Sequence, residues 1–409
     1  MKPMLFLLVS LLFVQEGYGL EQTPPAAPAA DLAAVVECNN AFAVDLYGKL
    51  RKQDGNLFFS PESISTALAM AYAGARGKTA REMAATLHFS LPPEQLHPAM
   101  GALLAGLNAE HAGYQLHMAD ALWAEQSYTF LDSFLKLTSA DYGAGLNRVD
   151  FKHSPDEVRA TINQWVTQKT ADKITNLIPR GGINASTRLV LTNAIYFKGD
   201  WATQFDKKQT QDEDFHLSAS QTIKASLMHR NGGFNYFDGG TFQVLEIPYK
   251  TNELSMIVLL PNDVAGLPAL EQSLTEANAR QWLRPGRFVS KVVLTMPKFK
   301  MTREFELAGT LGAMGMSRAF QADAADFSGM TGKPDLSISA VIHKAFVAVD
   351  EEGTEAAAAT AVTTRAAIAR APDRSQPIVF RVDHPFLFLI RDNHSGAILF
   401  MGRVTDPTK

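Results

Sequence analysis

Apolar residues in the first part of the chain recur mainly at helical spacing. From Val35 they return every three or four residues as far as Leu50, which predicts a helix. A second helix is predicted to begin after Ser60, because serine is a favourable N-cap and Pro61 suits the first helical position. The run Ile64–Tyr72 that follows is almost wholly apolar, so we expect this helix to be buried on most sides.

Further along, the pattern changes between helical and extended periods. Asp156–Lys173 carries its apolar residues on one face of a predicted helix. Thr187–Phe197 is rich in β-formers and has no charge after Arg188, which suits a central strand covered on both faces. Further strands are predicted at Val244–Tyr249, Leu254–Leu260, Lys291–Phe299 and Leu336–Asp350, with a closing hairpin formed by Phe380–Leu389 and Ala397–Arg403. Helices dominate the first half and strands the second, so the predicted fold class is α+β.

The composition is typical of a soluble globular protein. Of the 409 residues, 46% are hydrophobic and 20% are charged, and the formal net charge is −4. A slightly acidic chain lacks the basic surface that general nucleic-acid binding requires. The single cysteine, Cys38, excludes a disulfide framework, and the ten histidines lack metal-ligand spacing. We therefore expect no cofactor, no metal and no nucleic-acid or membrane partner.

Residues 1–19 have the organisation of a cleaved secretory signal. Lys2 precedes the apolar core Met4–Val14, and small residues follow at Gly17-Tyr18-Gly19. The alternative is a buried N-terminal helix; the apolar run is too short to span a bilayer of about 30 Å. Residues 20–36, rich in Pro and Ala, are predicted to be a flexible leader, and residues 37–409 a single domain. We expect the mature protein to be secreted, either extracellular or, in a bacterium, periplasmic.

The segment Glu351–Ser375 does not suit a static fold. It lies between two predicted strands, yet it runs for about 25 residues with few large apolar groups. Taken with a period of two, one set of its side chains is uniformly small or β-branched: Thr354, Ala356, Ala358, Thr360, Val362 and Thr364. Such a face, without proline, allows a segment to enter a sheet as a strand, and Gly353 at its base allows a hinge to change φ and ψ. The alternatives are a solvated linker and a surface helix, because alanine favours helices.

Several short motifs follow one another in a defined order from residue 37 onward. The hinge block Val349–Ala361 is similar to that of an inhibitory serpin almost residue for residue. Other segments that resemble the serpin family are Asn56–Ile64, Ile162–Val166, Leu191–Trp201, Met296–Phe299, Asp326–Met330, His343–Ala345, His384–Phe388 and Phe400–Val404. Each motif is weak alone, but their common order over nearly the whole mature chain is specific.

The resemblance implies a serpin fold: helices packed on a large central mixed sheet, smaller sheets, and an exposed reactive-centre loop at residues 351–377. It also implies a suicide-substrate mechanism, in which a serine protease attacks the loop and forms a covalent acyl complex. The cleaved loop then enters the central sheet as a strand and distorts the protease. We therefore expect a monomeric inhibitor whose partners are serine proteases, with cysteine proteases as a further class of target.

The resemblance also assigns roles to single residues. Ser60, Ser63, Asn193 and His343 match a polar cluster beneath the point where the sheet opens. Trp201 matches a bulky residue in the upper sheet, and Lys298 the expected partner of Glu351. The hinge then comprises Glu351, Glu352, Gly353, Thr354, Glu355, Ala356, Ala357, Ala358 and Ala359. Without the resemblance, the clustered residues would be interpreted as ordinary polar residues of a core.

The same resemblance places the scissile bond sixteen residues after Glu351, at Ala367-Ile368. A small residue before the bond suits elastase-like or subtilisin-like proteases, whose pockets are small or shallow. Arg365 and Arg370 are alternatives that would suit a trypsin-like protease. The stretch from Ala367 to Pro385 looks several residues longer than is usual in the family, which leaves the register open.

Two other functions compete with inhibition. A non-inhibitory serpin, acting as a binding or chaperone-like protein, would be expected to carry bulky, charged or proline residues in the hinge, unlike the Ala/Thr set found here. An exported enzyme would need a reactive pair such as Ser63 and His343. The chain has no G-x-S-x-G, H-E-x-x-H or C-x-x-C motif, which argues against catalysis.

Overall fold

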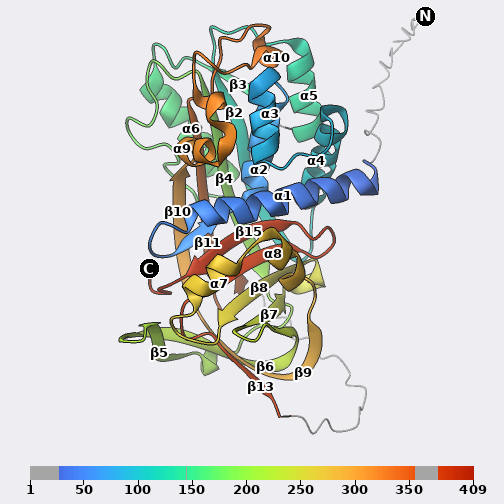
Figure 1. Cartoon of the computed structure of the whole chain (residues 1–409). Helices are drawn as coiled ribbons and strands as arrows, with labels where there is room; N and C mark the ends of the chain where they lie inside the picture. Colours follow the sequence, from blue (N-terminus) through green and yellow to red (C-terminus); the bar gives the residue numbers. More distant parts are fainter. Residues whose placement is uncertain (1–26, 144, 355–375) are drawn as a thin grey trace, which may run out of the picture.

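A computed structural model describes residues 27–143, 145–354 and 376–409, which form two β-sheets and the helices around them (Figure 1). The predicted signal, residues 1–19, lies outside the described residues. So do the loop positions Glu355, Ala356, Ala357, Ala358, Ala359, Arg365, Ala367, Ile368 and Arg370. None of the helices in the described ranges combines the length and the apolar character that a bilayer crossing needs.

The longer helices come early in the chain, as the apolar periodicity predicts. They are α1 (Ala29–Leu50), α2 (Pro61–Tyr72), α3 (Gly77–Thr86), α4 (Pro93–Asn108), α5 (Asp132–Tyr142) and α6 (Pro155–Lys169). Shorter helices follow at α7 (Leu267–Ser273), α8 (Glu276–Trp282), α9 (Ala308–Leu311) and α10 (Ser328–Thr331).

A six-stranded mixed sheet forms the centre of the molecule. Its order is β10 (Phe299–Glu306), β11 (Ala340–Val349), β12 (Gly353–Thr354), β4 (Leu189–Asp200), β2 (Tyr114–Glu125) and β3 (Leu146–Val149). β11 also pairs directly with β4, in parallel, so β12 occupies only one end of the space between these two strands.

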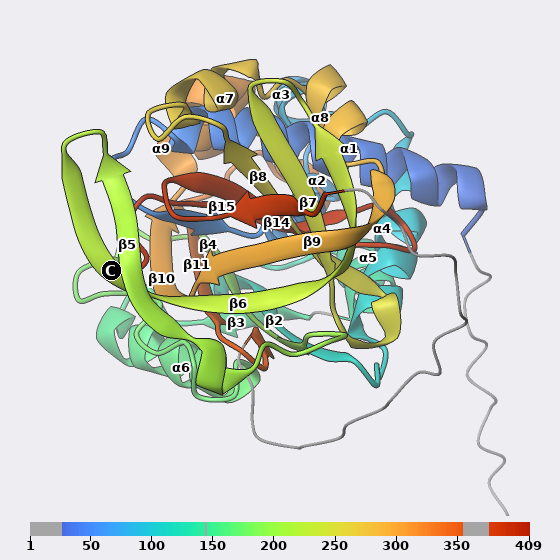
Figure 2. The same cartoon turned by 90° about the horizontal axis from the view of Figure 1, so that it is seen from below.

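A nine-stranded sheet fills the other half of the molecule. Its order is β1 (Leu57–Phe59), β15 (Ile398–Val404), β14 (Phe386–Asp392), β8 (Leu254–Pro261), β7 (Phe242–Pro248), β6 (Gln221–Asp238), β9 (Arg287–Pro297) and β13 (Ile378–Arg381), with β5 (Gln211–Ser218) paired to β6. Figure 2 shows the curved β5–β6 hairpin extending beyond the rest of this sheet.

Alternation along the central strands separates two apolar layers. Ala119 and Ala121 of β2 pack with Val158, Ile162 and Val166 of α6 on one face of the six-stranded sheet. The intervening residues of β2 and β4 point to the other face, where α2 lies against both strands and also against β15. α2 is therefore enclosed between the two sheets, which explains why its Ile64–Ala71 stretch is buried throughout.

Several predicted boundaries were wrong at the helices. α1 begins at Ala29, so the last eight residues of the predicted leader, 29–36, are helical rather than flexible. The helix predicted at Asp156–Lys173 ends at Lys169, because Ala171 and Asp172 adopt positive φ angles of 48° and 62° that a helix cannot continue.

Three predicted strands also differ from those observed. The strand Leu336–Asp350 starts only at Ala340. The strand Lys291–Phe299 is in fact the end of β9 and the start of β10, and the chain passes from one sheet to the other at Lys298. Phe380–Leu389 is likewise divided into β13 and β14, because Pro385 has no N–H to donate to a continuous ladder. The closing hairpin consists of β14 and β15 alone.

Candidate functional site

The two hinge residues Gly353 and Thr354 form β12, a short strand already inserted between β11 and β4. Thr354 lies opposite Val349 of β11 and opposite Gly199 of β4, and both pairings are antiparallel. Below this point β11 and β4 pair directly, from Ala340–Phe346 to Val190–Tyr196. The sheet is thus divided at one end by the beginning of the hinge and closed over the rest of its length.

Gly353 is required by close approach of two backbones. A Cβ atom at this position would lie 2.1 Å from the carbonyl oxygen of Gly199 and 2.7 Å from Cα of Asp200. Gly353 is not among the residues with positive φ, so its role in this state differs from the change of φ and ψ expected from the sequence. Any side chain here would push the hinge out of the sheet.

An aromatic pair holds the inserted end of the hinge. Thr354 is fully buried, and its hydroxyl shares a hydrogen bond of 2.7 Å with the Tyr249 hydroxyl. The Tyr249 ring stacks on Trp201, with 4.6 Å between ring centroids. Burial raises the pKa of Tyr249, so this hydroxyl stays protonated and available as a donor. Trp201, expected in the upper sheet, thus contacts the hinge through Tyr249.

Trp201 also binds the base of the hinge directly. Its indole Nε1 donates to the Asp350 carbonyl at 2.9 Å, and its backbone N–H donates to the Glu352 carbonyl at 2.9 Å. The Glu352 carboxylate forms an ion pair with Lys207. The chain entering β12 is therefore fixed by main-chain bonds as well as by charge.

Glu351 and Lys298 form a second ion pair at the hinge base. Nζ of Lys298 donates to Oε2 of Glu351 at 2.8 Å, and the Thr210 hydroxyl donates to Oε1 at 2.8 Å. Burial by itself would raise the pKa of Glu351, but these hydrogen bonds outweigh it and hold the pKa below its ordinary value. Lys298 reaches this carboxylate because the chain changes sheets at that residue.

The four predicted cluster residues meet beneath the strand pair that would have to separate. The backbone N–H of Ser60 donates to Nε2 of His343 at 3.1 Å, so in the neutral imidazole Nδ1 carries the proton and donates to Oδ1 of Asn193. Burial lowers the pKa of His343 to about 3, which keeps the ring neutral. Asn193 in turn donates to the Ser63 hydroxyl.

Two of these residues, Ser63 and Asn193, donate to a carboxylate that the sequence analysis missed, Asp120 of β2. Its Oδ1 accepts from the Ser63 hydroxyl at 2.8 Å and from Nδ2 of Asn193 at 2.5 Å. Glu62, also missed, is buried beside Ser63 in the first turn of α2. A signal existed for Asp120, since it is a charged residue among the apolar residues Met118–Leu122, but the strand that carries it was not predicted.

The alternative of a catalytic Ser63–His343 pair does not agree with the geometry. Ser63 donates its hydroxyl proton to Asp120 rather than to His343, and Nε2 of His343 already accepts from the backbone of Ser60. Both side chains are fully buried. Within the described ranges, no group of three or more His, Cys, Asp or Glu side chains is arranged to hold a metal ion.

Comparison with known proteins agrees with this architecture. The family model described as Serpin (serine protease inhibitor) matches residues 37–407. The leukocyte elastase inhibitor of Equus caballus is 42% identical over 378 residues, which cover 90% of this chain and 98% of that protein. Among solved structures, Serpin48 of Tenebrio molitor has a TM-score of 0.81 at 34% identity, covering 91% of this chain and 98% of its own. Human thyroxine-binding globulin complexed with thyroxine has a TM-score of 0.82 at 29% identity, covering 93% and 100%. The chain therefore belongs to the serpins, a family of serine protease inhibitors rather than enzymes.

Proposed function

We propose that this serpin is a secreted suicide-substrate inhibitor, whose cleaved loop inserts as a strand between β11 and β4. The observation that carries the proposal is β12 itself. Gly353 and Thr354 already lie between these strands, antiparallel to both, so a strand continued from them would enter the closed part of the sheet.

The existing pairings define a register for the insertion. Thr354 lies opposite Val349 and Gly199, and the direct β11–β4 pairing has the same offset, with Phe346 opposite Tyr196. Continued without a slip, the hinge would bring Ala357 opposite Phe346 and Tyr196. Residues 357–363 would then replace the seven pairings between 340–346 and 190–196. Both neighbouring strands would keep their register as they move apart to admit the new strand.

The side-chain pattern fits this register. Thr354 points into the interior toward Tyr249, and residues at even positions after it would share that face because side chains alternate along a strand. These are the small or β-branched residues Ala356, Ala358, Thr360, Val362 and Thr364. No large group would have to enter the core, whereas the charged Glu355 and Arg365 belong to the opposite set.

Insertion would trap the protease by distortion. A protease that cleaves the loop is covalently attached through an ester as an acyl-enzyme, and deacylation needs its oxyanion donors and general base in place. Moving the attached end of the loop down the sheet would displace those groups, and small displacements are enough to slow such a reaction severely. The free energy for this motion would come from strand pairing that is absent in the intact protein.

Elastase-like serine proteases are the proposed targets. The horse relative is named a leukocyte elastase inhibitor, and the small Ala367 before Ile368 suits the small pocket of such enzymes. Cleavage after Arg365 or Arg370 would instead direct inhibition at trypsin-like proteases, and cysteine proteases are a further class. A non-inhibitory binding function, as the name of thyroxine-binding globulin indicates for that protein, is disfavoured by the small residues of the hinge.

We also propose that residues 1–19 direct secretion and are removed. This rests on the sequence pattern of a basic start, an apolar core and a small-residue exit. The family match begins at residue 37, which is consistent with one inhibitor domain at residues 37–409.

Incubation with elastase-like and trypsin-like proteases tests the proposal. We expect a complex that survives denaturing electrophoresis, together with a released C-terminal peptide whose mass places its first residue at Ile368. A peptide that begins at Ala366 or Ala371 would move the scissile bond to Arg365 or Arg370. Cleavage without a stable complex would favour the non-inhibitory alternative. The matched control is the same protease with its catalytic serine inactivated.

A further inference from the structure

Two buried carboxyl groups beside the polar cluster are incompletely hydrogen bonded. Glu62 is 2% exposed, and its Oε1 accepts from the Thr66 hydroxyl at 3.0 Å while Oε2 has no partner. Asp120 uses Oδ1 for Ser63 and Asn193, and its Oδ2 is likewise inaccessible and without a partner. A buried acceptor left unpaired is costly for the folded state, and more so when it is charged.

No cation compensates these carboxyl groups in the described part of the chain. Among the titratable groups nearby, the neutral His343 of β11 belongs to the cluster, Tyr142 of α5 and Lys169 of α6 line the cavity beside Asp120, and His97 of α4 hydrogen bonds to Tyr142. From β3, β4 and β15, Asn147 lines the same cavity, while Asn193 and the Leu399 carbonyl take part in the hydrogen bonds of the cluster. None of these, and no side chain of α1 or α3, bonds to Oε2 of Glu62 or Oδ2 of Asp120.

We propose that Glu62 and Asp120 form a protonation-controlled lock, closed when the pair holds a proton and weakened when both groups are ionised. The inference rests on the proposed function, because the step that it controls is the separation of β11 from β4. Asp120 is the acceptor at the end of the chain of hydrogen bonds that crosses these strands through Asn193 and His343. It acts as a positioning residue.

The raised pKa values of both carboxyl groups support this assignment. Burial raises the pKa of Glu62 to about 7, and burial followed by the charge of Glu62 raises the pKa of Asp120 well above its ordinary value. Because the charge of Glu62 acts on Asp120, the ionisation of the two groups is coupled. Two like charges in one uncompensated site then oppose the closed sheet.

A cavity lies next to Asp120 and could supply water to the carboxyl groups. This cavity, of about 300 Å³, lies between β2 and helices α4, α5 and α6, and its lining includes Asp120, Thr66, Asn147 and Lys169. Separation of the strands would let water from this cavity reach Oε2 of Glu62 and Oδ2 of Asp120, which are inaccessible in the closed sheet. Opening therefore becomes more favourable as pH rises, in contrast to a switch based on a histidine that gains charge in acid.

The direction in which native stability changes with pH follows from proton linkage. A carboxyl whose pKa is raised in the native state binds more protons there than in the unfolded state, so native stability falls as pH rises between the two pKa values. With 4.5 for unfolded Glu62 and about 7 for the native group, unfolding of the wild type should become on the order of 50-fold more favourable between pH 5 and pH 8, relative to Glu62→Gln.

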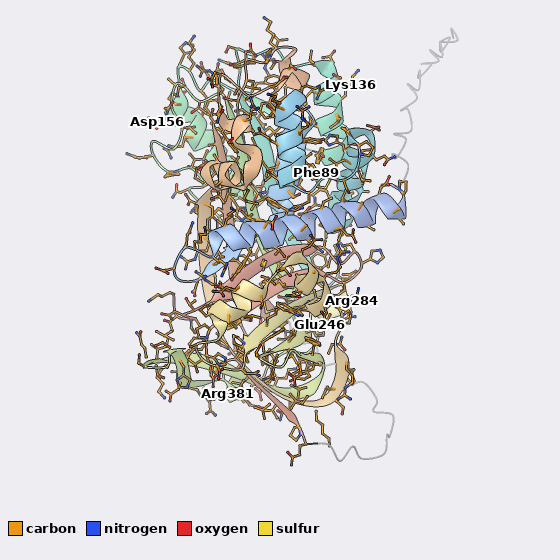
Figure 3. All side chains as sticks on the ribbon, in the orientation of Figure 1. Phe89, Lys136, Asp156, Glu246, Arg284 and Arg381 are labelled. Carbon is orange, nitrogen blue, oxygen red and sulfur yellow. The ribbon has the colours of Figure 1, made fainter. Side chains whose placement is uncertain are left out.

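The experiment compares the wild type with Glu62→Gln and Asp120→Asn, each of which keeps the accepting oxygen and removes the charge. Urea unfolding is measured from pH 5 to pH 8, together with the rate at which a synthetic peptide copying residues 354–365 is incorporated into the sheet. Asp156→Asn is the control, because this carboxylate is 89% exposed on α6 and Figure 3 shows it at the periphery of the molecule.

We expect wild-type stability to fall and peptide uptake to quicken as pH rises, with both slopes reduced in either variant and retained in Asp156→Asn. Equal slopes in the wild type and in both variants would overturn the lock. Unfolding is measured without a protease, so it reports on the titration of the pair independently of inhibition. If the free energy of unfolding changes with pH as expected but there is no peptide uptake and no protease trapping, the proposed function is refuted and the titration of the pair is not. Two independent variants keep the test decisive if one of them fails to fold.

Discussion

His343 of β11 lies directly opposite Asn193 of β4, and its Nδ1 donates to Oδ1 of that asparagine across the strand pair. The same two strands are already parted at one end by β12. The hydrogen bond therefore joins the edges of the space that the proposed insertion fills, and it must break or be exchanged when the sheet opens. The strength of this bond should set how readily the intact protein opens.

Replacement of His343 by alanine should loosen the closed sheet. It removes the bond to Asn193 and leaves the buried N–H of Ser60 without an acceptor, which we expect to lower the free energy of unfolding by about 1–3 kcal/mol. Inhibitory activity should also be lost faster on mild heating, as the loop inserts without cleavage. His394→Ala, at an exposed histidine in the β14–β15 turn, is the control; equal losses in both variants would contradict the role of His343.

Tyr249→Phe should release the inserted end of the hinge while leaving the aromatic stack on Trp201. The variant loses the 2.7 Å hydrogen bond to Thr354, a change of about 1 kcal/mol in favour of withdrawal of β12. Limited proteolysis at residues 355–375 should then be faster by several-fold. In a double-mutant cycle, Thr354→Val should have little further effect in the Tyr249→Phe background; additive effects would show that the two hydroxyls do not act together.

The Lys298–Glu351 pair should stabilise the hinge base in a pH-dependent manner. The pKa of Glu351 is depressed, so its contribution is present above the unfolded value of 4.5 and is lost as pH falls through the lower native value. The stability difference between the wild type and Lys298→Met should therefore shrink below about pH 4.5. Lys208→Met serves as the control for loss of a neighbouring positive charge. A difference that stays constant from pH 7 to pH 3.5 would argue against the pair.

A charge at an inward position of the hinge should convert the inhibitor into a substrate. Thr354→Arg places a long cation against buried Tyr249, so insertion should be blocked at its first step. Protease should then cleave the loop without forming a stable complex, with at least a tenfold loss of trapped product. Glu355→Arg, at the next position and in the opposite set, should retain trapping. If both variants behave alike, the assignment of faces is wrong.

The helices and strands that carry strong local signals could be predicted from the sequence. Ser60 is an N-cap whose hydroxyl accepts from the N–H of Ser63, as its place before Pro61 indicates. The buried strand with Asn193 was predicted because uncharged β-formers run through it. The resemblance of motifs predicted that Ser60, Ser63, Asn193 and His343 form one cluster. Hydrogen bonds connect all four residues in the structure.

The missed features depend on tertiary contacts. β2 escaped prediction because its alternation of polar Gln115 and His117 with apolar neighbours ends at Met118, where Asp120 takes an apolar position. Asp120 is tolerated there through its partners Ser63 and Asn193, which only the fold supplies. No local sequence pattern predicts that the chain passes from one sheet to the other at Lys298. The partner of Lys298 at this point is Glu351, which is distant in the sequence. Gly353 could be recognised as special, but the contact with Gly199 that requires it appears only when β4 is placed beside the hinge.

A crystal structure of the loop-cleaved protein is the most direct test of loop insertion. The account predicts a new strand between β11 and β4, with Ala357 opposite Phe346 and Tyr196 and with the side chain of Ala356 on the same face as Thr354. It would be contradicted by a cleaved loop lying outside the sheet while Ala340–Phe346 still pairs with Val190–Tyr196 as in the intact chain.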